Sequence, residues 1–355
     1  MNTIWTALLA SAAIVAAVPL AAQTPPKADP QMQAVLDQLA KLGPKPLDTL
    51  SPAEARKQPS PADAVMALLK SQGKSTAPEA VGKVENKTFP GPAGPVPIRI
   101  YTPAGSGPFP VILYIHGGGW VIANLDTYDG SARALTNAAQ AVLVSTHYRQ
   151  APEHKFPAAH DDTWAAYEWV LKNAKSFNGD ASRVALAGES AGGNMAAAIA
   201  LMARDRKVQM PVHQLLIYPV TNHAFDTPSY QENATAKPLG KAGMKWFFGH
   251  YLKSAADGDN PRVSMLRATN LKGLPPATII TAQIDPLRSE SEMYGKKLRE
   301  AGVDVHHQHY DGVTHEFFGM GAVVDKAKQA VEVAGNRLKA AFNKQHGTKD
   351  QGGLP

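Results

Sequence analysis

One short stretch of the chain carries a residue pattern that suits nucleophilic catalysis. Residues 188–194 read Gly-Glu-Ser-Ala-Gly-Gly-Asn, so Ser190 stands in a G-x-S-x-G pattern. A serine in this pattern attacks carbonyl carbons when a sharp turn between a strand and a helix lifts its hydroxyl above a β-sheet. Residues 183–187 have the length and apolar character of a strand, and the Ala-rich residues 195–203 are typical of a helix. The context therefore predicts that Ser190 is a nucleophile.

A serine hydroxyl also needs a base that takes its proton and a carboxylate that orients the base. Asp285 follows the apolar residues 277–281, and a carboxylate at the carboxyl end of a strand points toward the ligand-binding edge of a parallel sheet. A helix cap before Pro286 is the alternative role for this aspartate. His315 follows the last expected strand, on a loop before a helix, and from there its imidazole could reach Ser190.

An acyl-transfer site further needs donors for the oxyanion that forms on the attacked carbonyl. Residues 116–120, His-Gly-Gly-Gly-Trp, directly follow an expected strand and leave backbone N–H groups open. We expect Gly118, Gly119 and the helix-starting Ala191 to supply these donors; a flexible turn is the alternative for the glycines. The neighbouring residues expected to contact the substrate are Trp120, His116 and Gly117.

The elements that must position these groups alternate between strands and helices along the chain. This alternation is typical of a mostly parallel sheet covered by helices on both faces. The strands are expected at 96–101, 111–115, 141–146, 184–187, 214–218, 277–281 and 303–309, and the helices at about 127–139, 160–175, 191–206, 287–301 and 321–342.

Residues 221–262 interrupt the alternation and are too long for a simple connection. We expect a helical cap over the site, with a peripheral decoration as the alternative. Four aromatic residues of this insertion, together with Trp120, would crowd the substrate pocket and limit the length of an acyl chain: Trp246, Phe247, Phe248 and Tyr251.

Composition narrows the function classes. The 355 residues include no cysteine, which excludes disulfides, thiolate metal sites and a cysteine nucleophile. The formal net charge of +6 comes from thinly spread basic residues without a dense run, so we expect a solvated basic surface and no nucleic-acid partner. The proposed chemistry requires neither a cofactor nor a metal.

The chain begins with an apolar, Ala-rich stretch at residues 4–22. We expect residues 1–22 to be a signal peptide that exports the protein to the periplasm or the medium, with no stable membrane insertion after cleavage. An uncleaved membrane anchor is the alternative, because the first 26 residues hold no Lys or Arg. Residues 23–85 are expected to be a linker and cap segment, 86–345 the catalytic domain, and 346–355 a flexible tail.

These motifs together resemble the hormone-sensitive-lipase-like carboxylesterases, the bacterial family IV esterases. The resemblance rests on residues 116–120, 148–162 and 188–194, and on residues 285–287 together with His315, which fall in the order of the family. It implies an α/β-hydrolase fold, the triad Ser190, Asp285 and His315, and a cap made by the N-terminal stretch and the insertion. Glu189 departs from the usual Asp or Thr before the nucleophile, which leaves the subfamily open.

We therefore expect a serine carboxylesterase that acts on small-molecule esters with short or medium acyl chains. A deacetylase, an amidase or an acyltransferase would use the same groups. A non-catalytic ligand-binding protein on a hydrolase fold is the alternative from another class, although the presence of His315 argues against it. A homodimer stays open as an oligomeric state.

Overall fold

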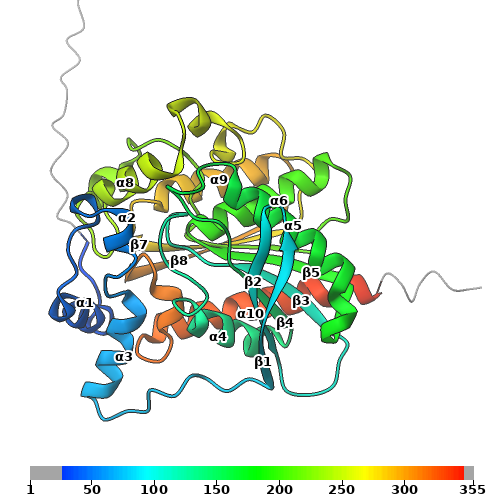
Figure 1. Cartoon of the computed structure of the whole chain (residues 1–355), viewed down its shortest axis with the longest axis horizontal. Coiled ribbons are helices and arrows are strands. Elements are labelled where there is room, and N and C mark those ends of the chain that lie inside the picture. The colour runs from blue at the N-terminus through cyan, green and yellow to red at the C-terminus, as the bar shows by residue number, and fades with distance from the viewer. Residues whose placement is uncertain (1–25, 348–355) are drawn as a thin grey trace, which may run out of the picture.

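The computed structural model describes residues 26–347, with side chains to residue 344, and is built on one eight-stranded sheet (Figure 1). The strand order is β1-β2-β4-β3-β5-β6-β7-β8. The two pairings that involve β2 are antiparallel and the remaining pairings are parallel. The strands are β1 Lys83–Gly91, β2 Gly94–Thr102, β3 Phe109–Ile115, β4 Val142–Thr146, β5 Gly179–Glu189, β6 Gln214–Ile217, β7 Ala277–Ile284 and β8 Val305–Thr314.

Helices cover both faces of this sheet (Figure 1). Helices α5 (Ala158–Asn173), α6 (Ala191–Asp205) and α9 (Arg288–Glu300) share one buried core with one face of the sheet. Helices α4 (Asp129–Ala139) and α10 (Asp325–Gly347) share the core on the opposite face. Because both faces are covered, the central strand β3, with the sequence Phe-Pro-Val-Ile-Leu-Tyr-Ile, is apolar and buried along almost its whole length.

The predicted fold class is confirmed, and each expected strand and sheet-covering helix is present within a few residues. The edge strand β1 was not expected. Its residues are mostly exposed and polar, as an edge strand allows, and they carry no apolar period that a sequence reading could detect. It pairs with β2 along its full length.

The N-terminal stretch folds into α1 (Pro30–Leu42), the short 3-10 helix η1 (Leu47–Thr49), α2 (Pro52–Ala55) and α3 (Pro61–Ser71). Its helices begin at clear caps: in α3, the Ser60 hydroxyl accepts from the Asp63 N–H, the Asp63 carboxylate accepts from the Ser60 N–H, and proline stands at the first helical position. The stretch is anchored to the catalytic domain by Arg56, which donates to the Val121 carbonyl at 2.8 Å and forms a bidentate pair with Glu153.

The insertion between β6 and β7 contains α7 (Pro228–Glu232), α8 (Lys241–Tyr251) and the 3-10 helices η3 (Ala255–Asp259) and η4 (Met265–Arg267). Helix α8 contacts η1, and the Trp246 indole donates to the Leu50 carbonyl at 3.0 Å. The insertion and the N-terminal stretch therefore meet above the carboxyl ends of the parallel strands, on the left of Figure 1.

The expected signal peptide, residues 1–22, and all but the first two residues of the expected tail lie outside the described residues. Residues 346 and 347 end α10. Within residues 26–347, no helix combines the length and the apolar character needed to cross a membrane.

Candidate active site

The turn at Ser190 is built as the sequence motif requires. Strand β5 ends at Glu189 and α6 begins at Ala191, so Ser190 is the single connecting residue. Its backbone is strained, with φ 56° and ψ −119°. A Cβ on Gly192 would lie 2.0 Å from the Ile115 carbonyl oxygen, so only glycine lets α6 start this close to β3.

Ser190, His315 and Asp285 form one hydrogen-bonded chain. The His315 Nε2 lies 3.0 Å from the Ser190 Oγ, and the Nδ1 lies 2.8 Å from the Asp285 Oδ2. The three residues come from the ends of β5, β7 and β8, and all are buried. The second carboxylate oxygen of Asp285 accepts from the Leu287 N–H at 2.8 Å, just before α9. The aspartate thus orients the imidazole and also holds the start of the helix, so the two roles considered from the sequence are compatible.

The three expected oxyanion donors lie around the same hydroxyl. Gly118 and Gly119 line a cavity together with Ser190, and Ala191 is the first residue of α6. Within the described part of the chain, no backbone carbonyl accepts a hydrogen bond from the N–H of any of the three. Free donors at a helix start and in a glycine loop can stabilise a negative oxygen.

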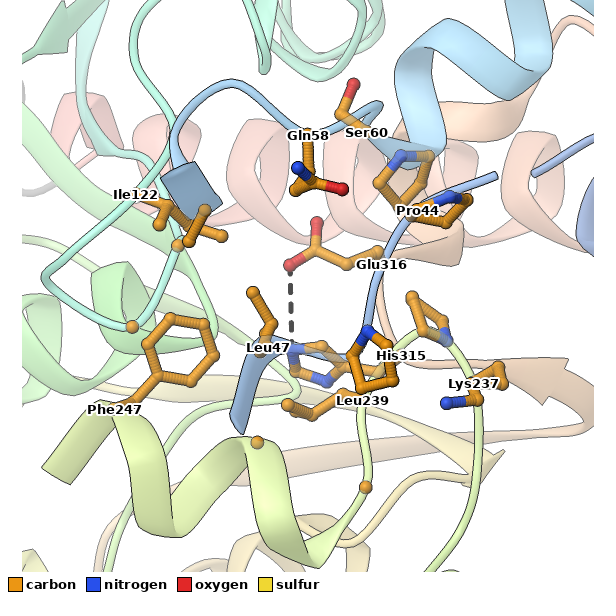
Figure 2. A pocket seen from close by; sticks show the side chains of 18 of the residues that line it. Pro44, Leu47, Gln58, Ser60, Ile122, Lys237, Leu239, Phe247, His315 and Glu316 are labelled. Atoms are coloured by element: carbon orange, nitrogen blue, oxygen red, sulfur yellow. Dashed lines mark ion pairs between the residues drawn. The ribbon is translucent and has the colours of Figure 1, made fainter. Parts of the chain in front are cut away.

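Ser190 and His315 open into a cavity of about 650 Å³ (Figure 2). The catalytic domain supplies one side of its wall, the N-terminal stretch (residues 36–61) another, and the insertion (residues 234–247) the third. The insertion therefore covers the site and is more than a peripheral decoration. The charged residues that line the cavity are Lys45, Asp48, Arg56, Lys237 and Glu316.

The residues expected to contact substrate beside the glycine loop lie outside this cavity wall. Trp120 is fully buried and stacks on Tyr251, with ring centroids 4.4 Å apart. The His116 ring is also buried and lies against the Gly117 carbonyl at 2.8 Å and the His147 ring at 2.9 Å. Trp120, His116 and Gly117 therefore lie on the core side of the glycine loop. At Trp120 the backbone has φ 62° and the indole is directed into the core.

Only part of the expected aromatic crowding is present at the cavity wall. Of the four aromatic residues of α8, only Phe247 lines the cavity. Phe248 and Tyr251 are buried against Trp120, and Trp246 is directed toward Leu50. On a helix, residues that are neighbours in sequence point in different directions, so one residue of a run faces the site.

Sequence reasoning did not single out Glu316, which directly follows the histidine. Its Oε1 lies 3.6 Å from the His315 Nε2 (Figure 2). The Tyr128 hydroxyl lies 2.8 Å from both of its carboxylate oxygens. The residue lines the cavity. An acidic residue next to a candidate base is a visible signal, but only the fold shows that this side chain turns back toward the imidazole.

Glu189 is a second buried acid next to the nucleophile. Its carboxylate accepts hydrogen bonds from the hydroxyls of Tyr114 and Tyr218, and it is 1% exposed. Burial, and then the nearby charge of Glu316, raises the pKa of Glu189 to about 7. One carboxylate thus joins Tyr114 on β3 to Tyr218, which directly follows β6.

The nearby carboxylates change the pKa of the His315 imidazole. Burial alone lowers the pKa of His315, but the charge and hydrogen bond of Asp285, followed by the charges of Glu316 and Glu189, outweigh it and raise the pKa above the usual value. The imidazolium that forms when His315 takes a proton is therefore stabilised.

Among the described residues, no group of three or more His, Asp or Glu side chains could hold a metal ion.

Known proteins share this fold and are similar to this chain in sequence. A protein family described as the alpha/beta hydrolase fold matches residues 112–319. The carboxylesterase NlhH of Mycobacterium tuberculosis is 41% identical over 252 residues, which cover 70% of this chain and 79% of that protein. The ethyl acetate hydrolase of Pseudomonas putida is 32% identical over 290 residues, covering 81% and 89%.

Solved structures agree with these relatives. The ester hydrolase EH1AB1 from the metagenome of Lake Arreo, in complex with a bipyridine phosphonate derivative, superposes with a TM-score of 0.80 at 38% identity, over 89% of this chain and 99% of that one. A thermostable esterase from Pseudomonas putida gives a TM-score of 0.81 at 35% identity, over 90% and 99%.

Proposed function

We propose a serine-esterase mechanism for this chain, which belongs to the hormone-sensitive-lipase-like, family IV branch of the α/β hydrolases and is a carboxylic-ester hydrolase. Ser190 attacks the ester carbonyl while His315 takes the hydroxyl proton through Nε2. Asp285 keeps the imidazole in the tautomer that presents a free Nε2 and stabilises the charged form. The N–H groups of Gly118, Gly119 and Ala191 receive the oxyanion.

The second half of the reaction uses the same groups in reverse. His315 gives its proton to the leaving alcohol, which departs and leaves an acyl group on Ser190. Water then enters, His315 takes one of its protons, and the resulting hydroxide attacks the acyl carbonyl. Collapse of that intermediate releases the acid and returns the proton to Ser190. No step needs a cofactor.

The observation that carries this proposal is the unbroken hydrogen-bonded chain from Ser190 through His315 to Asp285. A fluorophosphonate should label Ser190 covalently, as shown by mass spectrometry of the modified peptide. Ser190→Ala should fold, take no label and lose about 10⁶-fold in kcat on p-nitrophenyl butyrate. Ser176→Ala, at an exposed serine, is the matched control.

The outcomes separate the function classes. Retention of more than about a tenth of the activity by Ser190→Ala would remove Ser190 as the nucleophile. Absence of both label and turnover in the wild-type protein would favour a non-catalytic ligand-binding protein. Turnover of amides or transfer to added alcohols at rates above those of ester hydrolysis would instead assign an amidase or an acyltransferase.

We further infer that the substrates are small esters with short or medium acyl chains. This inference rests on the cavity of about 650 Å³, which must hold both halves of the ester, and on the Phe247 ring that closes against Gly119. The name of the Pseudomonas putida relative, an ethyl acetate hydrolase, is consistent with small substrates. Esters of rising acyl length, from acetate to palmitate, test this size limit.

We also infer that the protein is exported and cleaved near Ala22, because residues 4–22 are apolar and small residues precede Gln23. Intact-mass analysis of protein from the native host tests this inference. A mature form that starts near residue 23 would support it, and a form that still starts at Met1 would contradict it.

A further inference from the structure

The Glu316 carboxylate stands in the cavity wall beside the atom that handles the leaving group. Its Oε1 lies 3.6 Å from the His315 Nε2, and its side chain is 20% exposed (Figure 2). The backbone at Glu316 is left-handed, with φ 73°, a conformation that is unfavourable for a non-glycine residue. The surrounding fold therefore holds this side chain toward the cavity.

The carboxylate has acceptor capacity that the protein leaves unused. An ionised carboxylate offers about four acceptor sites. The Tyr128 hydroxyl fills one of them, because it has a single proton to donate. Two uncharged polar side chains that Figure 2 labels across the cavity donate to other acceptors: the Gln58 amide donates to the Glu54 carbonyl, and the Ser60 hydroxyl donates to Asp63. Neither supplies a hydrogen bond to Glu316.

The position of the Glu316 carboxylate places it next to the alcohol half of a bound ester. The His315 Nε2 is the atom that returns a proton to the leaving alcohol, so a group next to Nε2 lies on the alcohol side. A purely apolar alcohol there would take water away from the carboxylate and give it no donor in exchange, which is unfavourable. An alcohol half that carries its own donor would avoid this loss.

We propose that Glu316 selects esters whose alcohol half carries a hydroxyl group close to the ester oxygen, that is, monoesters of diols or polyols. This inference rests on the proposed esterase function. The hydroxyl donates to the free acceptor sites of Glu316 while the ester oxygen faces His315. Among the charged residues of the cavity wall, the cations Lys45, Arg56 and Lys237 outnumber the acids Asp48 and Glu316, which favours a neutral hydroxyl over an ammonium group.

A matched pair of substrates tests the proposal. Butyrate esters of ethylene glycol and of 1-propanol differ only by a hydroxyl in place of a methyl group. The ratio of their kcat/KM values, measured by pH-stat titration, is normalised to their rates of hydrolysis by hydroxide, which removes their difference in intrinsic reactivity. We expect the wild-type ratio to favour the hydroxyl ester by roughly tenfold, the effect of one hydrogen bond to a charged group.

Three variants give the comparison. Glu316→Met keeps the length of the side chain and removes the acceptors, and should bring the ratio close to one. Glu316→Gln keeps one neutral acceptor and should give an intermediate ratio. Glu300→Met, at a side chain that is 63% exposed, is the control and should keep the wild-type ratio. Because each ratio compares two esters on one protein, a general loss of activity cancels.

The result separates this proposal from the function on which it rests. A wild-type ratio near one, or an equal ratio in the wild type and in Glu316→Met, overturns the selection by Glu316 while p-nitrophenyl butyrate is still cleaved. If p-nitrophenyl butyrate is not cleaved by the wild-type protein, the esterase function fails and this proposal fails with it. If Glu316→Met does not fold, the wild-type and Glu316→Gln ratios decide.

Discussion

The ring centroids of Tyr218 and His315 lie 4.5 Å apart, and the Tyr218 hydroxyl donates a hydrogen bond to Glu189. Tyr218 therefore contacts both groups: its ring packs against the His315 imidazole, and its hydroxyl binds the buried Glu189 carboxylate. With Glu316 close to the Nε2 and Asp285 on the Nδ1, the imidazole has carboxylates on several sides. This arrangement has consequences for both stability and the pH dependence of activity.

The first prediction concerns stability and Glu189. The pKa of this acid is about 7 in the folded protein, raised by burial and by Glu316 above the ordinary value of 4.5. The folded state thus binds the proton more tightly than the unfolded state, so the free energy of unfolding falls as pH rises from 4.5 to 7. The contribution amounts to roughly 3 kcal/mol. Glu189→Gln should remove this fall.

Urea unfolding at intervals between pH 4.5 and 8 measures the effect. The wild-type free energy should decline more steeply over this range than that of Glu189→Gln, and the exposed control Glu300→Gln should follow the wild type. Parallel profiles for wild type and Glu189→Gln would show that the acid keeps an ordinary pKa in the folded protein.

The second prediction concerns the acid limb of activity. The proposed mechanism needs a neutral His315, so kcat/KM should fall as pH drops through the pKa of this histidine. That pKa is raised, because the carboxylates of Asp285, Glu316 and Glu189 together outweigh the effect of burial. Glu316→Gln removes one negative charge and should lower the pKa of His315, which moves the acid limb to lower pH.

The measurement is a pH profile of kcat/KM on p-nitrophenyl butyrate for wild type, Glu316→Gln and Glu300→Gln. An acid limb at the same pH in wild type and Glu316→Gln, or one moved to higher pH, would contradict an electrostatic link between the two residues. The profile reports a position on the pH axis, so it is independent of how much activity the variant retains.

Much of the site could be predicted from sequence because it depends on local backbone chemistry. The strand, turn and helix around Ser190 can be recognised from residues 183–203 alone, and the ends of parallel strands bring Asp285 and His315 to the same edge. The direction of a side chain within a loop or helix is not local. The indole of Trp120 turns into the core, and the carboxylate of Glu316 turns back to the imidazole, only because of packing between distant elements.

The third prediction concerns the glycine loop. A Cβ on Gly119 would lie 2.2 Å from the Phe247 ring, and its φ of 56° is unfavourable for alanine. Gly119→Ala must therefore move either the loop or α8. We expect a loss of about 10² to 10³ in kcat, the effect of one displaced oxyanion donor. Stopped-flow or steady-state assays on p-nitrophenyl acetate measure this loss.

Gly249→Ala is the matched control, because a Cβ there meets nothing within 4 Å and the residue lies inside α8. It should keep full activity and gain slight stability from a better helix former. Full activity in Gly119→Ala would mean that the loop carries no oxyanion donor at this position.

The last prediction concerns acyl length and Phe247. This is the only aromatic residue of α8 that lines the cavity, and its ring lies against the glycine loop, on the path that we propose for the acyl chain. Each methylene that finds apolar contact adds about 0.8 kcal/mol, or roughly fourfold in kcat/KM. In the wild type, kcat/KM should rise over the first few carbons and fall by roughly eight carbons, once the space beside the ring is filled.

Phe247→Ala opens that space, so the acyl length at which kcat/KM is highest should move to longer chains. Phe225→Ala, at an aromatic residue outside the cavity wall, should keep the wild-type maximum. Values of kcat/KM for p-nitrophenyl esters from acetate to palmitate give the three profiles. A wild-type preference for decanoate or longer, or an unchanged maximum in Phe247→Ala, would show that the acyl chain follows another path and that Phe247 does not set its length.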